Sequence, residues 1–523
     1  MKTKQILCAL LLASCQVAQA EYIETVQVIA KVTPPIVVDP VVVATVNESL
    51  QPSMVFVPGG IGGFAGYGER GTQPNHTAVY RNGVPVNDAG AGWYDFGHDL
   101  STGNELARIV SGPQGVLYGT SSMGGTVFLM DSINPGALVK TGTRGEVVSV
   151  SPTSQINLTY ADIDNGSVRT DNTETDYYQQ SAIRVQEGFL DDTIFVNASY
   201  QDYSYDYDDC YTSSWTSSND CTQEGTRTSV SVRTENITLG YSSNQSDFFT
   251  GDALTYDTDA ETFYADARKV LTTDMDVDVL IGTTLRKDNY IGRSQEVVEP
   301  YVLVSYDNMF DVGMRVTDGA TVGRMGFRTG DFYITVSSSY RVPTLYETYG
   351  DGVWVMENTV LDPEKGVGYE AGFKDLTVFR YEFSQGIDYD FGALGYVNTG
   401  EYVSQGMRYS DTFELLAGSL TLSVGYTDTD RPRMPEYMTS LAYNKSFGQW
   451  RINAQFAGQY SRGLDPLSNT ALSDVNTFDL FVTRSFDKHH ISVGIEDVFD
   501  NAIEIVPGYG AGGQQFTLTW HYR

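Results

Sequence analysis

The sequence is poor in positive charge, in histidine and in cysteine. Its 523 residues contain 33 lysines and arginines against 66 aspartates and glutamates, which gives a formal net charge of −33. A chain of this charge is repelled by phosphate backbones, so we expect no nucleic acid among its partners. It has 5 histidines, and we find no nucleophile elbow, phosphate-binding loop or Cys/His metal spacing in it. We therefore do not expect an enzyme.

Long apolar runs are also missing after the first twenty residues. Residues 1–20 begin with two lysines, continue in an apolar run and end in Ala-Gln-Ala, which is typical of a secretory signal peptide cleaved after Ala20. The alternative is lipoprotein processing at Cys15. Downstream, no apolar run reaches the ~18 residues that a membrane helix needs. A helical membrane protein is thereby excluded, whereas one that crosses the membrane with strands is not.

Glycine and aromatic residues are abundant, with 52 glycines, 35 tyrosines and 24 phenylalanines. From about residue 135 onward apolar and polar residues alternate with a period of two, for example in 194–200, 332–340, 420–426 and 450–456. Such alternation is typical of strands with one apolar and one polar face. Roughly 20 to 22 such segments, often with aromatic ends and preceded by an export signal, predict a transmembrane β-barrel with aromatic girdles.

A glycine-rich block occupies residues 104–129 and reads NELARIVSGPQGVLYGTSSMGGTVFL. Its glycines permit positive φ, and its Gly-Pro step presets a turn. Between the turns we expect short extended segments at 107–110, 116–118 and 126–129. The block therefore predicts a small sheet element and not a helix.

The same block resembles the end of the plug domain of TonB-dependent outer-membrane receptors. There Arg-Ile, Gly-Pro-Gln, Leu-Tyr-Gly and Gly-Gly follow one another in this order and spacing. Two positions depart from the family pattern, because Asn82 stands where aspartate is usual and Ser111 where arginine is usual. Further stretches that resemble the family lie at 69–71, 79–87, 340–350, 361–364, 369–372 and 493–500.

The resemblance implies a fold dominated by β-structure, namely a 22-stranded transmembrane β-barrel with an N-terminal α/β plug domain inside its lumen. It divides the chain into a signal peptide at 1–20, a TonB-box segment at 21–31, the plug at 32–137 and the barrel at 138–523. It also implies the outer membrane of a Gram-negative bacterium, contact with outer-membrane lipid and insertion by the barrel assembly machinery.

The implied function is active uptake of a scarce ligand, either cobalamin or a ferric siderophore or other iron chelate. Energy would come from the inner membrane through TonB, with ExbB and ExbD behind it, and no cofactor would be required. The segment that resembles the TonB box, which pairs with TonB by strand addition, is Glu24, Thr25, Val26, Gln27, Val28, Ile29 and Ala30. The alternative is a passive porin or an adhesin-like barrel without energy coupling.

Aromatic residues gather in the region that lies near the outward-facing apex of the plug in this family. Their position on a loop favours ligand binding. The alternative is that the rings brace the plug against the barrel. The candidates are Trp93, Tyr94, Asp95, Phe96 and His98. With no arginine at position 111, the candidates for the ionic contact between plug and barrel are Arg70 and Arg108.

Cys210 and Cys221 remain after signal cleavage and lie close together in an exported chain, so we expect them to form a disulfide. Aspartates cluster around them and on the next hairpin. Hard cations bind oxygen ligands of this kind, and the vitamin B12 receptor of the family orders its outer loops with calcium. The alternative is that these loops are simply solvated. The candidate calcium ligands are Asp202, Asp206, Asp208, Asp209, Asp257 and Asp259.

Overall fold

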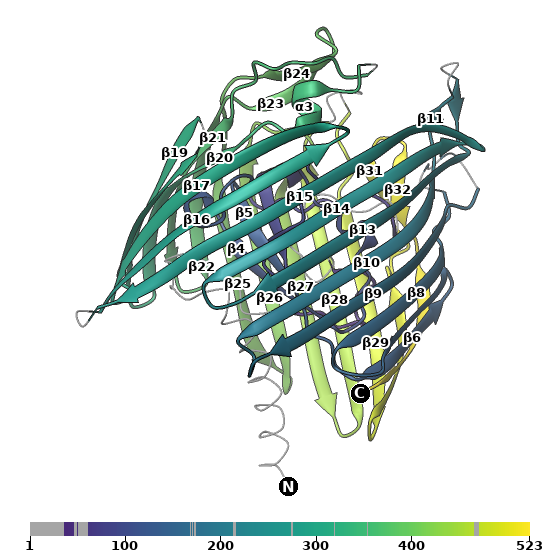
Figure 1. Cartoon of the computed structure of the whole chain (residues 1–523). Helices are drawn as coiled ribbons and strands as arrows, with labels where there is room; N and C mark the ends of the chain where they lie inside the picture. Colours follow the sequence, from purple (N-terminus) through teal and green to yellow (C-terminus); the bar gives the residue numbers. More distant parts are fainter. Residues whose placement is uncertain are drawn as a thin grey trace.

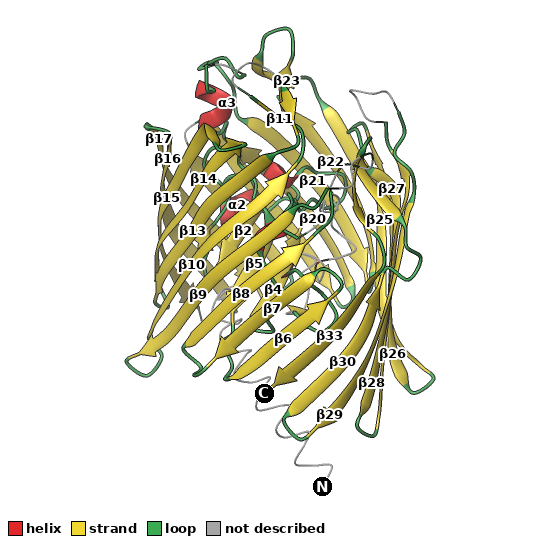
Figure 2. Ribbon diagram, turned by 90° about the vertical axis from the view of Figure 1, so that its right-hand side faces the viewer, coloured by secondary structure: helices red, strands yellow, loops and turns green. Residues whose placement is uncertain are grey.

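The structure is a computed structural model that describes residues 36–46, 50, 61–167, 169, 171, 174–212, 216–273, 276–317, 319–352, 354–464 and 470–523. Within these residues, 22 antiparallel strands form a closed barrel around a five-stranded sheet (Figures 1 and 2). The predicted fold class is therefore confirmed. The predicted signal peptide and the predicted TonB box at 24–30 lie outside the described residues.

The barrel closes because its first strand pairs with its last. β6 and β33 run antiparallel, with Thr141 opposite Leu518. In chain order the barrel strands are β6 (Gly136–Gly142), β7 (Gly145–Ser151), β8 (Ile156–Asp164), β9 (Tyr177–Phe189), β10 (Ile194–Tyr207), β13 (Cys221–Arg233), β14 (Ile237–Thr250), β15 (Ala253–Thr272), β16 (Val277–Tyr290), β17 (Arg293–Tyr306), β18 (Phe310–Thr317), β19 (Ala320–Thr329), β20 (Phe332–Arg341), β21 (Glu364–Phe373), β22 (Leu376–Ser384), β25 (Tyr402–Leu415), β26 (Gly418–Thr429), β27 (Pro435–Phe447), β28 (Trp450–Arg462), β29 (Val475–Phe486), β30 (His489–Glu496) and β33 (Gln515–Tyr522).

The strands carry apolar side chains outward and polar side chains into the lumen. In β33, Phe516 and Leu518 are 50% and 47% exposed, whereas Thr517 and Thr519 are 8% and 1% exposed. This is the inverse of a soluble protein and matches a barrel whose outer face meets lipid. The four segments that alternation predicted lie in β10, β20, β26 and β28.

The inner sheet, the plug, has the strand order β1-β4-β5-β2-β3. Its strands are β1 (Ile36–Val37), β2 (Thr77–Arg81), β3 (Val84–Pro85), β4 (Glu105–Ser111) and β5 (Gly125–Asp131). β2 and β5 are parallel, and the other neighbours are antiparallel. The Asn82-Gly83 turn that joins β2 to β3 has positive φ at both residues, 48° and 85°. Asparagine and glycine are the residues that tolerate this hairpin turn most readily.

The expectation of an extended segment at 116–118 is wrong. Gly115–Tyr118 forms the short helix α2, whose last turn ends at Gly119 with φ 71°. The amides of Leu117 and Tyr118 both donate to the carbonyl of Gln114. The carbonyls of Val116 and Leu117, which have no partner within this turn, accept hydrogen bonds from Arg315 of the barrel. A residue distant in sequence therefore stabilises the helical turn.

Short elements gather at one end of the barrel, and the C-terminus lies at the other (Figure 1). This end carries α3 (Leu345–Tyr349) and the small hairpins β11–β12 (Cys210–Tyr211, Ser217–Ser218) and β23–β24 (Ile387–Asp390, Gly395–Asn398), and a further pair is β31–β32 (Ala502–Val506, Tyr509–Gly512). The 3-10 helices η2 (Pro74–His76) and η3 (Phe96–His98) belong to the plug. Among the described residues no helix has the length and hydropathy to cross a membrane.

The outward face generates a first prediction. Leu518→Arg places a charge on the lipid-facing surface, and we expect it to lower the free energy of unfolding by about 2–4 kcal/mol near the bilayer midplane. Glu146→Arg adds the same side chain at an exposed position of β7 and is the control. Urea unfolding in lipid vesicles measures both. Equal stabilities for the two variants would contradict the assignment of Leu518 to the lipid face.

Candidate functional site

A cavity of about 1390 Å³ lies between the plug and the end of the barrel that carries α3 and β11. Its floor includes plug residues 86–91 and 93–95, and its wall includes residues of β10, β13, β14 and β15. Residues of α3 and of the hairpin β23–β24 complete the lining. The cavity is thus built from segments that lie up to about 300 residues apart in the chain.

The plug loop that forms the floor is held by two polar side chains. The Asn87 carboxamide accepts from the Val79 amide at 2.7 Å and donates to the carbonyls of Thr77 and Gly92 at 2.9 and 3.1 Å. The Asp88 carboxylate accepts from the amides of Gly90 and Ala91 at 2.8 and 2.7 Å. These side-chain bonds to the backbone take the place of the regular backbone hydrogen bonds of a helix or strand. They hold the loop that carries Trp93.

The five predicted apex residues divide into two groups. Trp93, Tyr94 and Asp95 line the cavity. Trp93 is 36% exposed and packs edge-on against Phe64, with 5.4 Å between ring centroids. Phe96 is buried in the plug core, and His98 is buried against Tyr203 of the wall. A role of the first group in ligand binding stays a prediction, and the second group does not line the cavity.

Tyr94 is oriented by a buried charge network. Its hydroxyl donates to Asp99 Oδ2 at 2.6 Å, and Arg81 donates to Asp99 Oδ1 at 2.7 Å and to Asp131 Oδ1 at 3.1 Å. Burial, together with the neighbouring Asp99 carboxylate, raises the pKa of Tyr94 to about 12. The phenol therefore keeps its proton at neutral pH and can donate it to Asp99.

Much of the cavity lining was missed by sequence reasoning. Phe64 of the plug and the residues of α3 and β23–β24 were not singled out as site residues. Of the wall residues on the barrel strands β10 to β16, only Asp257 was named, as a candidate calcium ligand. Many of the missed residues are aromatic, and some, such as Tyr207 and Tyr290, lie at the ends of strands, where aromatic residues resemble those of a girdle. The missed aromatic residues of the lining are Phe64, Tyr200, Tyr205, Tyr207, Tyr211, Phe248, Tyr256, Tyr290, Tyr346, Trp354, Tyr389 and Tyr396.

The sequence model of one known family, described as TonB dependent receptor-like, beta-barrel, matches residues 72–498, which is more than half of the chain. This chain belongs to the TonB-dependent receptor-like family. The family consists of outer-membrane transporters and receptors and not of enzymes, in agreement with the expectation from sequence.

Solved structures of siderophore receptors share the fold of this TonB-dependent receptor. The siderophore receptor PirA from Acinetobacter baumannii superposes with a TM-score of 0.67 at 14% identity, over 92% of this chain and 96% of that one. A double mutant of the ferric enterobactin receptor PfeA from Pseudomonas aeruginosa gives 0.71 at 14% identity, over 97% and 99%. The siderophore receptor PiuA from Acinetobacter baumannii gives 0.68 at 14% identity, over 96% and 98%. At these identities the likeness concerns the fold alone.

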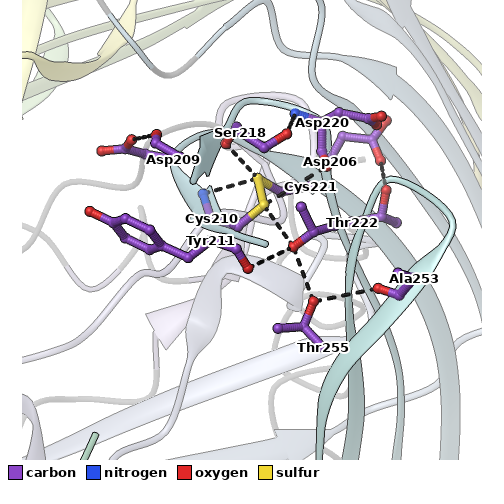
Figure 3. Close-up of a disulfide and its surroundings, with 12 residues drawn as sticks. Asp206, Asp209, Cys210, Tyr211, Ser218, Asp220, Cys221, Thr222, Ala253 and Thr255 are labelled. Atoms are coloured by element: carbon purple, nitrogen blue, oxygen red, sulfur yellow. Dashed lines mark hydrogen bonds between the residues drawn. A yellow bond between two sulfur atoms is a disulfide. The ribbon is translucent and has the colours of Figure 1, made fainter. Parts of the chain in front are cut away.

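Cys210 and Cys221 of this receptor form a disulfide at the rim of the cavity (Figure 3). The Cys210 amide donates to Cys221 Sγ at 3.1 Å. The Thr250 hydroxyl reaches Cys210 Sγ at 3.3 Å and the Tyr211 carbonyl at 3.2 Å, so the hairpin β11–β12 is tied to the end of β14. The bridge therefore holds Tyr211 beside the cavity.

The candidate calcium ligands do not converge within the described part of the chain. Of the six aspartates, only Asp208 joins a carboxylate cluster, in which it lies with Glu174 and Asp176 so that one ligand atom from each falls within 4.8 Å of the others. Asp209 instead accepts from the hydroxyls of Ser217 and Tyr509.

The other four candidates lie on barrel strands. Asp206 accepts from the Thr222 hydroxyl at 2.9 Å, and Asp259 accepts from the Gln245 side chain at 3.2 Å. Asp202 and Asp257 are exposed. Calcium binding by these loops stays a prediction.

The predicted contact residue Arg70 reaches the barrel wall from the plug. Its Nη1 donates to Glu370 Oε1 and to the Tyr381 hydroxyl, both at 2.5 Å, and its guanidinium lies 5.1 Å from the centroid of the Phe379 ring. The whole group is buried. Arg108 lies half-buried on β4, opposite Phe128 of β5, and its role in the attachment stays a prediction.

The arginines of the wall, which sequence reasoning missed, also bind the plug. Arg408 contacts Glu69 at 2.9 Å, and the same carboxylate accepts from the Ser111 hydroxyl at 3.0 Å. Arg315 donates to the carbonyls of Val116 and Leu117 at 2.9 and 2.7 Å. Two further wall arginines are bound to plug side chains, namely Arg324 to Gln114 and Arg184 to Glu105.

The attachment of the plug generates a second prediction. Arg70→Met leaves Glu370 buried without its cation, which we expect to destabilise the protein by about 3–5 kcal/mol. The control is Arg380→Met, because Arg380 pairs with Glu382 on the outer surface, where both side chains are about half exposed, and such pairs contribute about 0–1 kcal/mol. Urea unfolding and proteolysis of the plug measure the difference. Similar losses in both variants would argue against a supporting role for Arg70.

Proposed function

We propose that this protein takes up a scarce ligand across the outer membrane by a mechanism energised through TonB. The ligand, cobalamin or a ferric chelate, binds in the cavity above the plug. TonB, with ExbB and ExbD behind it, pairs with residues 24–30 and drives a rearrangement of the plug that lets the ligand pass. The observation that carries this proposal is the family match together with a folded plug inside a closed barrel.

The occupied lumen favours coupled uptake over the passive alternative. A passive porin conducts through an open, water-filled lumen. Here a five-stranded sheet occupies the lumen, and arginines from both sides hold it to the wall. Moving such a plug means exchanging several buried ion pairs, which needs an input of free energy. TonB is the source that the family membership supports.

A chain of polar contacts joins the cavity to the plug and offers a route for coupling. Glu347 lines the cavity and accepts from Arg341 at 2.8 Å. Arg341 donates to Glu364 at 2.6 Å, and Glu364 lies 2.9 Å from His76 Nε2 at the end of η2. Burial lowers the pKa of His76, so the ring is neutral at pH 7 and can act as hydrogen-bond donor to Glu364. A ligand that displaced α3 would therefore change the contact between Glu364 and His76 of the plug.

The size of the cavity supports a large ligand. Pockets for drug-sized molecules measure about 300–1,000 Å³. The cavity here, at about 1390 Å³, exceeds this range and suits a corrinoid or a ferric chelate.

Deleting residues 24–30 tests the proposal. We expect the variant to bind its ligand as tightly as the parent protein, because the described lining of the cavity begins at Gly62 and does not include this segment, and to lose uptake. Binding and cellular uptake are measured for cyanocobalamin, ferrichrome and ferric enterobactin, with the parent protein as the control. Unchanged uptake after deletion of 24–30 would favour the passive porin.

Trp93→Ala tests whether the cavity is the binding site. Truncation of a central aromatic contact typically costs about 2 kcal/mol or more, so we expect the affinity for the panel ligand that binds to fall at least about tenfold. Trp450→Ala, at the exposed start of β28, is the control because it lies outside the cavity lining. Isothermal titration in detergent measures both, and equal affinities would move the ligand to another surface.

A further inference from the structure

The charged side chains of the cavity are mostly acidic. Seven carboxylates line it, among them Asp88, Asp351 and Asp388, against three guanidinium groups. The lining thus carries a formal charge of −4. A concave surface lined by one sign of charge concentrates the field within it, attracts ions of the opposite sign and repels like ions.

The three arginines of the lining are already engaged by carboxylates. Arg81 binds Asp99 and Asp131, and Arg184 binds Glu105. Arg227 donates to the backbone carbonyl of Asp95 at 2.7 Å and lies 3.6 Å from its carboxylate. A polyanionic ligand would have to break these pairs to obtain a cation, and each exchange would leave a buried carboxylate without its partner.

The carboxylates on the other side of the cavity are fixed in place. The Asp351 carboxylate accepts from the amides of Trp354 and Val355 at 2.7 and 3.0 Å, and from the Tyr346 hydroxyl at 3.0 Å. Two lining carboxylates pair with arginines outside the lining, Asp388 with Arg431 at 2.9 Å and Glu347 with Arg341 at 2.8 Å. Two lining arginines pair in turn with carboxylates outside it, Arg81 with Asp131 and Arg184 with Glu105, so these outside charges cancel. Because the fold itself holds these groups, the negative charge belongs to the lining of the cavity.

Exposed aromatic rings supply the remaining contact surface. Phe64 and Trp93 on the floor are 41% and 36% exposed, and Trp354 on the opposite side is 47% exposed at 6.0 Å from the Tyr211 ring. Aromatic faces attract cations and stack on flat apolar surfaces. Neither interaction favours a ligand with high negative charge.

We infer that the ligand of this cavity is a large neutral or cationic molecule with a flat or apolar face, and not a polyanionic chelate such as a ferric tris-catecholate. The inference rests on the proposed function, because it assumes that the cavity is where the ligand binds. Among iron chelates it selects uncharged or cationic hydroxamates, and it is equally compatible with an uncharged corrinoid.

Collisional quenching of Trp93 tests the charge of the cavity without knowledge of the ligand. Caesium, iodide and acrylamide are the cationic, anionic and neutral quenchers, each referred to N-acetyltryptophanamide. The experiment uses the full chain in neutral detergent at low salt. The fluorescence of Trp93 is obtained by subtracting the fluorescence of the Trp93→Phe variant from that of the parent protein. We expect the caesium-to-iodide ratio to exceed the reference at least about threefold. The ratio should approach the reference in 0.5 M NaCl, where the Debye length is only a few ångströms.

Two variants sharpen this test. Asp88→Asn removes one charge beside the Trp93 loop and should lower the ratio by about twofold. Asp191→Asn, in the exposed turn between β9 and β10, should leave it unchanged. If Trp93→Phe does not fold, Trp354→Phe provides the same subtraction from the other side of the cavity. Iodide quenching equal to or stronger than caesium quenching overturns the inference.

A ligand comparison completes the test. Ferrioxamine B carries one positive charge and ferric enterobactin three negative charges, and binding of each is titrated by the same Trp93 signal. The inference is supported if ferric enterobactin quenches Trp93 less than ferrioxamine B does, or not at all. If ferrioxamine B does not quench either, the caesium ion serves as the reference. Tighter binding of ferric enterobactin overturns it. Both measurements use purified protein at equilibrium, so the 24–30 deletion variant must give the same results as the parent protein. The proposed function is tested separately, because it fails only if that deletion variant keeps its uptake.

Discussion

The closure of the barrel sheet is the constraint on which the rest of the structure depends. In hydrocarbon each unsatisfied backbone amide or carbonyl costs several kcal/mol, so a sheet that crosses a membrane must have no free edge. The pairing of β33 with β6 removes that edge. Once the sheet is closed, every second side chain faces lipid and the others face the lumen. The outer face is therefore apolar and the lumen is lined with threonine, serine, aspartate, glutamate and arginine.

A polar lumen determines how the plug is held. A plug packed only by apolar contacts would leave the charged groups of the wall without partners, at a large desolvation cost. The wall arginines are instead satisfied by plug groups, either carboxylates such as Glu69 and Glu105 or the carbonyls of α2. Such contacts are strong when complete and can be exchanged as discrete pairs. They therefore suit the proposed mechanism, in which the plug stays closed at rest and is rearranged through TonB.

Some of the site was predictable from the sequence because its causes are local. The Asn-Gly turn, the glycine-rich block and the aromatic loop that carries Trp93 act within a few residues, and alternation identified β10, β20, β26 and β28. Local reasoning failed where a distant partner decides the outcome. The α2 turn was expected to be extended, but Arg315 from β18 binds its carbonyls. Phe96 and His98 were grouped with Trp93, but η3 turns them away into the plug and against the wall.

The sequence by itself determined the barrel, the plug and the family, because strand periodicity and turn chemistry are written in neighbouring residues. Only the tertiary structure decided which charges meet and what the cavity offers a ligand. Arg70 of the plug pairs with Glu370 of the barrel, 300 positions later in the sequence. The cavity likewise brings together carboxylates from the plug, from β15 and from the segments around α3 and β23. A shift of one residue in the register of β21 would turn Glu370 from the lumen to the lipid. No local pattern records which pairs the correct register brings together.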